Sequence, residues 1–502
     1  MKSATLTDLA EDLEELTTLI RDAEWRLTSF KMHFALHPSH AMPETKKILL
    51  SMADDLSARY KNMREELRTA LKTRNRWEAR DSYRLIEIKL RLHDEVRALQ
   101  GVMASIVASS DWQSPSYQHS HNSQAGTQTG KIHGTTNDYK LDHHLDAENY
   151  EADFCRAYID KPLLVPVTAY VTSSGMSAFT TILTSLEHDN RLSGKVIAGD
   201  ATYFENKILL EKKCGDRVIF IDERKTAELV EAVKIHKPSA IFLDSLCNNE
   251  AVVMPDLRGI LSELEKIITT PTVFVLDNSG LATGYQPYTD WTRKNPNLTL
   301  VVRESLNKLH QFGFDRVTGG VIWVETFSDI NIFGTRMHAG TNMPDASVIS
   351  MPKPNRKMLD KRLERFERNT LYVANRLENK IRSLNKTIFS HVNFPGLANH
   401  SCFEWTKNAK FHGMIFSISF KPGTDVVANA CKFIDTAIKE ARSNGVKLNA
   451  GTAFGFNTTR IYLTARFAKE FASPFLRFAI GTETQEEIEK LADVFERVIE
   501  NF

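Results

Sequence analysis

Three short segments each place a polar residue at the end of an apolar run, the arrangement by which strands present reactive groups at the edge of a sheet. Lys308 follows the run VVRESLN, and Asp277 follows VFVL. The turn SSGMSA, at 173–178, separates the run AYVT from the helical pattern FTTILTSL. A lysine held among apolar side chains loses its charge readily and forms imines with carbonyl groups. These residue types therefore indicate an amine nucleophile, an acid and an anion cradle.

Each segment alone has an ordinary explanation. The turn at 173–178 is like many turns between a strand and a helix, and Asp277 could cap a helix or pair with a buried cation. Together, in this order within one domain, they are what pyridoxal phosphate requires, because this cofactor carries a phosphate, a pyridine nitrogen and an aldehyde. The sequence thus predicts a pyridoxal-phosphate site.

The elements that would position these groups can also be read from the sequence. Strand-like runs alternate with amphipathic helices over about 137–345, which predicts an α/β fold with a mainly parallel, seven-stranded sheet and helices on both faces. A long helix is expected over 355–381. The remainder mixes strand and helix patterns, which predicts a smaller α+β domain. We expect a large domain over 137–385 and a small domain over 386–502.

Residues 1–110 contain one glycine, and apolar residues recur there at spacings of three and four, which predicts a helical hairpin or three-helix bundle. Residues 1–24 carry seven acids against two bases, and 60–97 carry eleven bases against seven acids. We interpret this as solvated helix faces that guide pairing; a basic face for RNA or an acidic partner is the alternative. Residues 111–136 are expected to be a flexible linker. The histidines of the linker match no metal-ligand spacing.

The composition limits the class of protein. The chain has 502 residues, 42% hydrophobic and 25% charged, with a formal net charge of +1. No overall field favours nucleic acid or an anionic membrane, and neither partner is expected. Five cysteines without a CxxC pair argue against a disulfide framework or a zinc finger. With no apolar run of membrane-spanning length, a cytoplasmic protein is expected.

The sequence resembles the Cys/Met metabolism family of fold type I pyridoxal-phosphate enzymes, which includes cystathionine synthases and lyases and methionine γ-lyase. The resemblance covers about 137–502 and omits the first 110 residues. Lys308, Asp315 and Gly319 keep the family's spacing of seven and eleven residues after the lysine. The segments RLERFERNTLYVANRL, FPGLANH and LRFAIGTET also match family landmarks.

The resemblance implies roles for individual residues. Lys308 would hold the cofactor as a Schiff base and then shuttle protons, while Asp277 would keep the pyridine nitrogen protonated. Tyr203 would stack on the ring and assist proton transfer at the leaving group. Arg477 would bind the substrate carboxylate as a bidentate partner, with Asn248 between cofactor and carboxylate. The residues expected to hold the phosphate are Ser174, Gly175, Met176 and Ser305.

The sequence also departs from the family pattern. Where the family has a Tyr-x-Arg motif that reaches a neighbouring subunit's phosphate, this chain has Tyr139-Lys140-Leu141. We keep Tyr139 as a candidate substrate-binding residue, and Lys140 could replace the arginine as a point charge. Asn307 replaces the usual threonine before the lysine, and Phe454 stands where γ-active enzymes often have a glutamate.

The function implied by the resemblance is γ- or β-elimination or replacement on an amino acid such as an O-activated homoserine, methionine or a cysteine derivative, as in a cystathionine γ-synthase-like enzyme. Transamination is an alternative on the same fold. A largely non-catalytic interaction protein that works through its helical extension is another. The resemblance also implies a homodimer or homotetramer.

Overall fold

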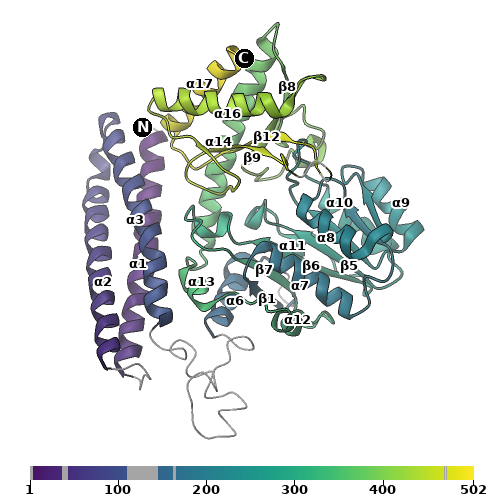
Figure 1. Ribbon diagram of the computed structural model, residues 1–502, viewed down its shortest axis with the longest axis horizontal. Helices are drawn as coiled ribbons and strands as arrows, with labels where there is room; N and C mark the ends of the chain where they lie inside the picture. Colours follow the sequence, from purple (N-terminus) through teal and green to yellow (C-terminus); the bar gives the residue numbers. More distant parts are fainter. Residues whose placement is uncertain (1–3, 37–42, 110–144, 162–164, 468–469, 471) are drawn as a thin grey trace, which may run out of the picture.

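The computed structural model describes residues 4–36, 43–109, 145–161, 165–467, 470 and 472–502. The expected linker at 111–136, with its histidines, and Tyr139 lie outside the described residues. Figure 1 shows a helical bundle standing beside a large sheet covered by helices, with a smaller sheet above the large one.

The N-terminal bundle consists of the helices α1 (Ala4–Leu36), α2 (Pro43–Lys72) and α3 (Ser82–Ser109), with two 3₁₀ turns (Arg74–Arg76 and Ala79–Asp81) between α2 and α3. The apolar positions at spacings of three and four form its core, where Leu9, Leu13 and Leu92 are fully buried. The predicted N-terminal helical region is therefore confirmed.

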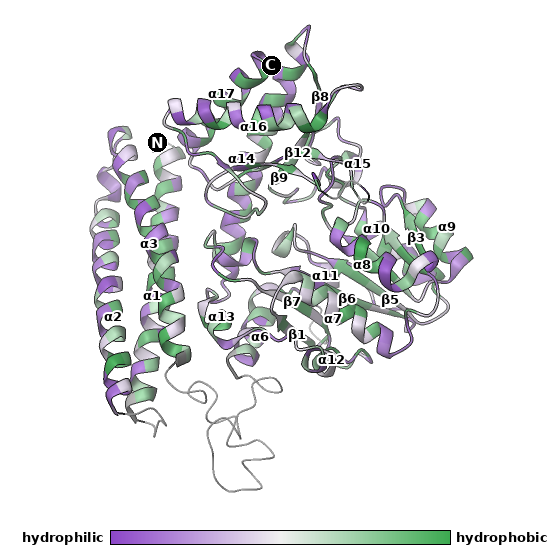
Figure 2. Ribbon diagram, viewed as in Figure 1, coloured by the Kyte–Doolittle hydropathy of each residue, from purple (hydrophilic) through white to green (hydrophobic). Residues whose placement is uncertain are grey.

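The large sheet has seven strands in the order β1-β7-β6-β5-β4-β2-β3. Strands β2 to β6 are parallel, and β7 runs antiparallel to both of its neighbours, β6 and β1. The predicted α/β fold with a mainly parallel sheet is confirmed. Figure 2 shows the hydrophobic character of the central strands, as expected for strands covered on both faces. The strands are β1 (Val167–Thr172), β2 (Val196–Gly199), β3 (Val218–Ile221), β4 (Ala240–Asp244), β5 (Thr272–Asp277), β6 (Leu298–Ser305) and β7 (Gly320–Glu325).

Helices cover this sheet in part because each crossover between parallel strands needs a connecting segment. The helices of the large domain are α6 (Leu145–Tyr158), α7 (Gly175–His188), α8 (Phe204–Cys214), α9 (Thr226–His236), α10 (Leu257–Ile267), α11 (Pro287–Asp290), α12 (Ile332–His338) and α13 (Asp345–Ser350). The 3₁₀ turns are η4 (Gly215–Arg217), η5 (Ala282–Gly284) and η6 (Leu309–Gln311).

The small sheet has the order β10-β11-β12-β9-β8 and is packed against α16, which in turn packs against α17. The helix α14 (Arg356–Ser383) joins the two domains, because Leu359 and Phe366 belong to the core of the large domain while Val373 and Leu377 belong to that of the small one. The remaining elements are β8 (Phe389–Asn393), α15 (Phe403–Thr406), β9 (Ile415–Phe420), α16 (Val426–Ser443), β10 (Asn449–Ala450), β11 (Arg460–Thr464), β12 (Phe475–Ala479) and α17 (Gln485–Glu500).

The bundle docks on the rest of the chain through buried charges. The Asp8 carboxylate accepts hydrogen bonds of 2.9 Å from Arg368 on α14 and from the backbone N–H of Gln485 at the start of α17. Lys89 on α3 lies 3.0 Å from Asp12 and 3.5 Å from Glu487, and only 3% of its side chain is exposed. Asp8 thus satisfies an N–H group that the helix itself leaves without a partner.

None of the described helices is both long and apolar enough to cross a bilayer.

Candidate active site

Asp277, at the end of β5, pairs with an arginine on the adjacent strand. Arg303 Nη2 lies 2.6 Å from Asp277 Oδ2, and the backbone N–H of Ser279 donates to Asp277 Oδ1 at 2.9 Å. Arg303 Nη1 also donates to the carbonyl of Gly175 at 3.1 Å, which ties the acid to the start of α7. Arg303 is 3% exposed. The sequence analysis missed it, although a charged residue inside the apolar strand LTLVVRES is a signal.

A second carboxylate lies beside this pair. Asp244 ends β4 directly opposite Asp277 in the register of the two strands. It accepts hydrogen bonds from Thr202 Oγ1 at 2.5 Å and from the backbone N–H of Tyr203 at 2.9 Å. Burial, and then the charge of Asp277, raise the pKa of Asp244 to about 7. Asp244 also escaped the sequence analysis, although it ends the run AIFL as Asp277 ends VFVL.

The turn predicted as an anion cradle lies at the N-terminus of α7. Ser174 caps this helix by accepting from the backbone N–H of Ser177 at 3.0 Å. A Cβ atom on Gly175 would come within 2.9 Å of Ser305 Cβ, so the end of β6 lies against the first turn of the helix. Met176 follows, half-buried. The four residues proposed for the phosphate therefore come together where N–H groups and the helix dipole favour an anion.

Lys308 follows β6 and immediately precedes η6. Burial, and then the nearby Arg477 guanidinium, lower the pKa of Lys308 to about 8. Its Nζ lies 4.9 Å from the centre of the Phe454 ring. A Cβ atom on Gly455 would lie 2.6 Å from the Lys308 carbonyl oxygen, so only glycine lets this loop approach so closely. The lysine thus has the apolar, cationic surroundings that keep an amine partly neutral.

Arg477 comes from β12 of the small sheet and faces the large domain. Its Nη1 donates to Asn248 Oδ1 at 2.9 Å, and its Nη2 donates to the carbonyl of Thr452. Its Nε is buried and has no hydrogen-bond partner among the described residues. Burial lowers the pKa of Arg477 to about 10, which still leaves it charged at neutral pH. Phe454 lies between the two cations, 5.8 Å from the guanidinium.

Tyr203 stands at the start of α8, next to this cluster. Burial and the neighbouring Glu205 raise the pKa of Tyr203 above its ordinary value, so its hydroxyl stays protonated even in alkaline solution. The charges of Arg477 and Arg303 act on it in the opposite direction, which places it near both. Tyr139 cannot be placed, because it lies outside the described residues.

These groups fit pyridoxal phosphate. The cradle at Ser174, Gly175 and Ser305 suits a phosphate, Asp277 suits a protonated pyridine nitrogen, and Lys308 suits the aldehyde. The buried Nε of Arg477, which has no partner within the part of the chain that the structure describes, is a further donor suited to a carboxylate.

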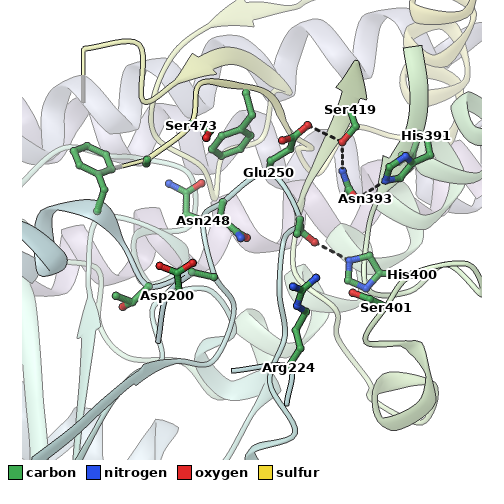
Figure 3. A pocket seen from close by; sticks show the side chains of 18 of the residues that line it. Asp200, Arg224, Asn248, Glu250, His391, Asn393, His400, Ser401, Ser419 and Ser473 are labelled. Carbon is green, nitrogen blue, oxygen red and sulfur yellow. Dashed lines mark hydrogen bonds between the residues drawn. The ribbon is translucent and has the colours of Figure 1, made fainter. Parts of the chain in front are cut away.

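A polar cavity lies beside this cluster rather than within it. It has a volume of about 720 Å³ between the two domains, and of the site residues predicted from the sequence only Asn248 lines it. In Figure 3, hydrogen bonds already join Glu250 to Ser419 at 2.7 Å and His400 to the Ala251 carbonyl at 2.8 Å. The cavity is therefore polar and leads to Asn248. Several of the residues that line it form hydrogen bonds with one another.

Comparison with known proteins points to one family. Residues 112–495 match the family model described as "Cys/Met metabolism PLP-dependent enzyme". The curated bifunctional enzyme flvA of Aspergillus flavus is 23% identical over 321 residues, which are 64% of this chain, and the chain spans only 37% of the length of that relative.

Solved structures agree on the fold. Cystathionine γ-synthase from Xanthomonas oryzae pv. oryzae, in complex with cystathionine, has a TM-score of 0.57 at 18% identity over 72% of this chain and 88% of that one. MetB from Corynebacterium glutamicum has a TM-score of 0.57 at 19% identity, over 72% of this chain and 87% of that one. Cystathionine γ-lyase from Lactobacillus plantarum, complexed with L-serine, has a TM-score of 0.55 at 16% identity, over 72% of this chain and 89% of that one. This chain belongs to the Cys/Met metabolism family of pyridoxal-phosphate-dependent enzymes.

Proposed function

We propose that this chain catalyses elimination or replacement at Cγ or Cβ of an amino acid such as an O-activated homoserine, methionine or a cysteine derivative, with Lys308 as the catalytic amine. The observation that carries the proposal is the placement of Lys308, whose pKa is lowered to about 8, against Phe454 and near Arg477. An amine with this pKa both accepts and returns a proton near neutral pH.

The cofactor would be held by groups from three strand ends. Ser174, Gly175, Met176 and Ser305 would bind its phosphate, Asp277 its pyridine nitrogen and Lys308 its aldehyde carbon. When bound, pyridoxal phosphate stores the electrons released as a bond to the substrate Cα breaks. The protein supplies orientation and the proton transfers.

The substrate would be oriented from the small domain. Arg477 Nε and the amide of Asn248 would bind the α-carboxylate, which fixes the Cα–H bond relative to Lys308 Nζ. Lys308 would take that proton at Nζ and carry protons between Cα and Cβ. Tyr203, whose hydroxyl is protonated at neutral pH, would donate this proton to the leaving group.

Phe454 limits the substrates that fit. Its ring covers the side of Lys308 with an apolar surface, where a second ammonium or carboxylate would have to shed water without a partner. Substrates with an uncharged distal group are therefore favoured over cystathionine, whose distal end carries both charges.

A substrate panel tests the proposal. The purified protein should turn yellow with pyridoxal phosphate, and Lys308→Ala should abolish the colour while the exposed control Lys294→Ala keeps it. O-acetylhomoserine, methionine, cysteine and cystathionine would then be scored for 2-oxo acid release and for new thioethers. A protein that stays colourless overturns the proposal. Amino-group exchange with the side chain intact would assign transamination instead.

We also propose a homodimer or homotetramer. The support is the family pattern, in which active sites lie at subunit interfaces. Light scattering of the purified protein measures the mass, and a monomer at all concentrations would refute this.

A further inference from the structure

The helix α3 of the N-terminal bundle contacts the loop that follows Lys308 at three successive points. His93 Nε2 lies 3.3 Å from the Phe312 carbonyl oxygen, and Arg97 Nε donates to the Phe314 carbonyl at 2.5 Å. At Gly101 a Cβ atom would lie 2.8 Å from the Arg316 guanidinium, so that side chain crosses the helix there.

The spacing of these contacts is regular. His93, Arg97 and Gly101 are four residues apart, so they form one stripe along the helix. Four helical residues rise about 6 Å, and two residues of non-helical chain span at most about 7 Å. The stripe therefore meets every second residue of the loop.

The loop itself needs external support. Phe312 has a φ of +49° and Asp315 a φ of +43°, both in the left-handed region that side chains other than glycine rarely adopt. Such conformations persist only where the surrounding structure holds them. The carbonyls of Phe312 and Phe314, on either side of Gly313, are two groups of this loop that α3 binds.

A second route from the bundle reaches the other side of Lys308. Glu15 on α1 accepts from Arg362 Nη1 at 2.8 Å, and Arg362 Nη2 donates to Asn457 Oδ1 at 2.7 Å. Asn457 lies in the loop that carries Phe454 and Gly455, the loop that touches the Lys308 carbonyl. The two segments that border the lysine are thus both tied to the bundle.

We propose that the bundle is a built-in brace of the active site, in which His93 and Arg97 are positioning residues that fix the backbone after Lys308. They act through that backbone on the placement of Nζ against Phe454. The brace rests on the proposed function only in that Lys308 is the working lysine. It assigns to the first 110 residues a task within the same chain.

Hydrogen exchange of the full-length, cofactor-free protein tests the brace directly. The amides of Phe312 and Phe314 are protected by the bonds to Leu309 and Gln311. In Arg97→Ala they should exchange about tenfold faster, as expected for one lost hydrogen bond of about 1.4 kcal/mol. The matched control is Arg91→Ala, on the same helix, whose partners Glu66 and Glu95 belong to the bundle.

A second measurement reports on the lysine. The pH midpoint for acetylation of Lys308, read by mass spectrometry on the cofactor-free protein, should shift in Arg97→Ala, return towards the wild-type value in Arg97→Lys and stay unchanged in Arg91→Ala. Equal loop exchange and equal midpoints in Arg97→Ala and Arg91→Ala would overturn the brace. Should Arg97→Ala not accumulate as folded protein, His93→Ala decides by the same readings.

These readings need no cofactor and no substrate. A failure of the proposed chemistry, seen as a protein that stays colourless with pyridoxal phosphate, is therefore separate from a failure of the brace.

Discussion

Asp244 and Asp277 lie side by side on β4 and β5, and Arg303 on β6 is the cation that acts on both. Two neighbouring carboxylates repel each other when they are buried, so Arg303 determines whether both can stay charged. The electrostatics of Asp277 are therefore set by residues on three strands.

Removal of that arginine should be costly. Arg303→Met is expected to lower the free energy of unfolding at pH 7 by about 3 kcal/mol, because it leaves buried carboxylates without a cation. Urea unfolding of the cofactor-free protein measures the loss. Arg258→Met is the control, because its ion pair with Asp290 involves a guanidinium that is 83% exposed and should contribute little. Equal effects of the two changes would contradict the assignment.

Asp244 should give the fold a pH dependence of its own. Its pKa is about 7 in the folded chain and 3.8 ordinarily, so between these values the folded form keeps a proton that the unfolded form has lost. Its contribution to stability therefore falls as pH rises from about 4 to about 7. Asp244→Asn should flatten this slope in urea titrations at several pH values, whereas the exposed Asp54→Asn should leave the slope as it is.

A carboxylate in place of the aromatic ring should restore charge to the lysine. Phe454→Glu is expected to raise the pKa of Lys308 from about 8 towards its ordinary 10.5, because an anion near Nζ favours the ammonium form. The pH dependence of Lys308 acetylation in cofactor-free protein measures this. Phe454→Leu keeps the wall apolar and should not move the midpoint upward; a matching rise in both variants would rule out the electrostatic cause.

Arg477 should govern substrate binding more than turnover. Arg477→Ala is expected to raise KM by about 100-fold, or about 3 kcal/mol, since a hydrogen-bonded charge pair to the carboxylate is lost. Steady-state kinetics on the best substrate of the panel would separate KM from kcat. Arg477→Lys keeps the charge without the planar guanidinium, so its KM should lie between those of the wild type and the alanine variant. An unchanged KM in the alanine variant would remove Arg477 from the carboxylate site.

Asp8 should hold the bundle in place. Asp8→Ala leaves Arg368 without its bidentate partner and the N–H of Gln485 without an acceptor, which should destabilise the protein by about 3 kcal/mol. Thermal unfolding measures the loss, and hydrogen exchange in the first turns of α17 should speed up with it. Asp54→Ala, which breaks the exposed pair with Lys31, should have almost no effect on either reading.

The large domain was predictable because buried parallel strands have continuous apolar sequences. Its candidate site was predictable because ligands bind at the carboxyl ends of such strands. Asp277 ends such a strand and Lys308 lies three residues beyond one, so the sequence could place both at the same edge of the sheet. Arg303 and Asp244 were missed because a single charge in or after a strand has several explanations, and only the register of β4, β5 and β6 selects among them.

The docking of the bundle could not be read from charge alone. The acidic excess of the first helix was interpreted as guiding pairing within the bundle, and Glu14 does pair with Arg74 there. Asp8, however, meets Arg368, which is 360 residues further along the chain. Composition gives the sign of such a surface but not its partner, because the partner depends on how α14 is oriented in the folded domain.

The position of the bundle also governs how the two domains can move. Through α3 it holds the Phe312 and Phe314 carbonyls of the large domain, and through Asp8 it holds Gln485 of the small one. Asn248 and Arg477, which we propose to bind the substrate, belong to the large and the small domain respectively. A hinge motion that separated the two domains would have to break the contacts of the bundle with one of them. The bundle therefore restrains such a motion. We therefore expect opening of the two domains to cost these contacts, which favours substrate entry by movement of side chains and short loops.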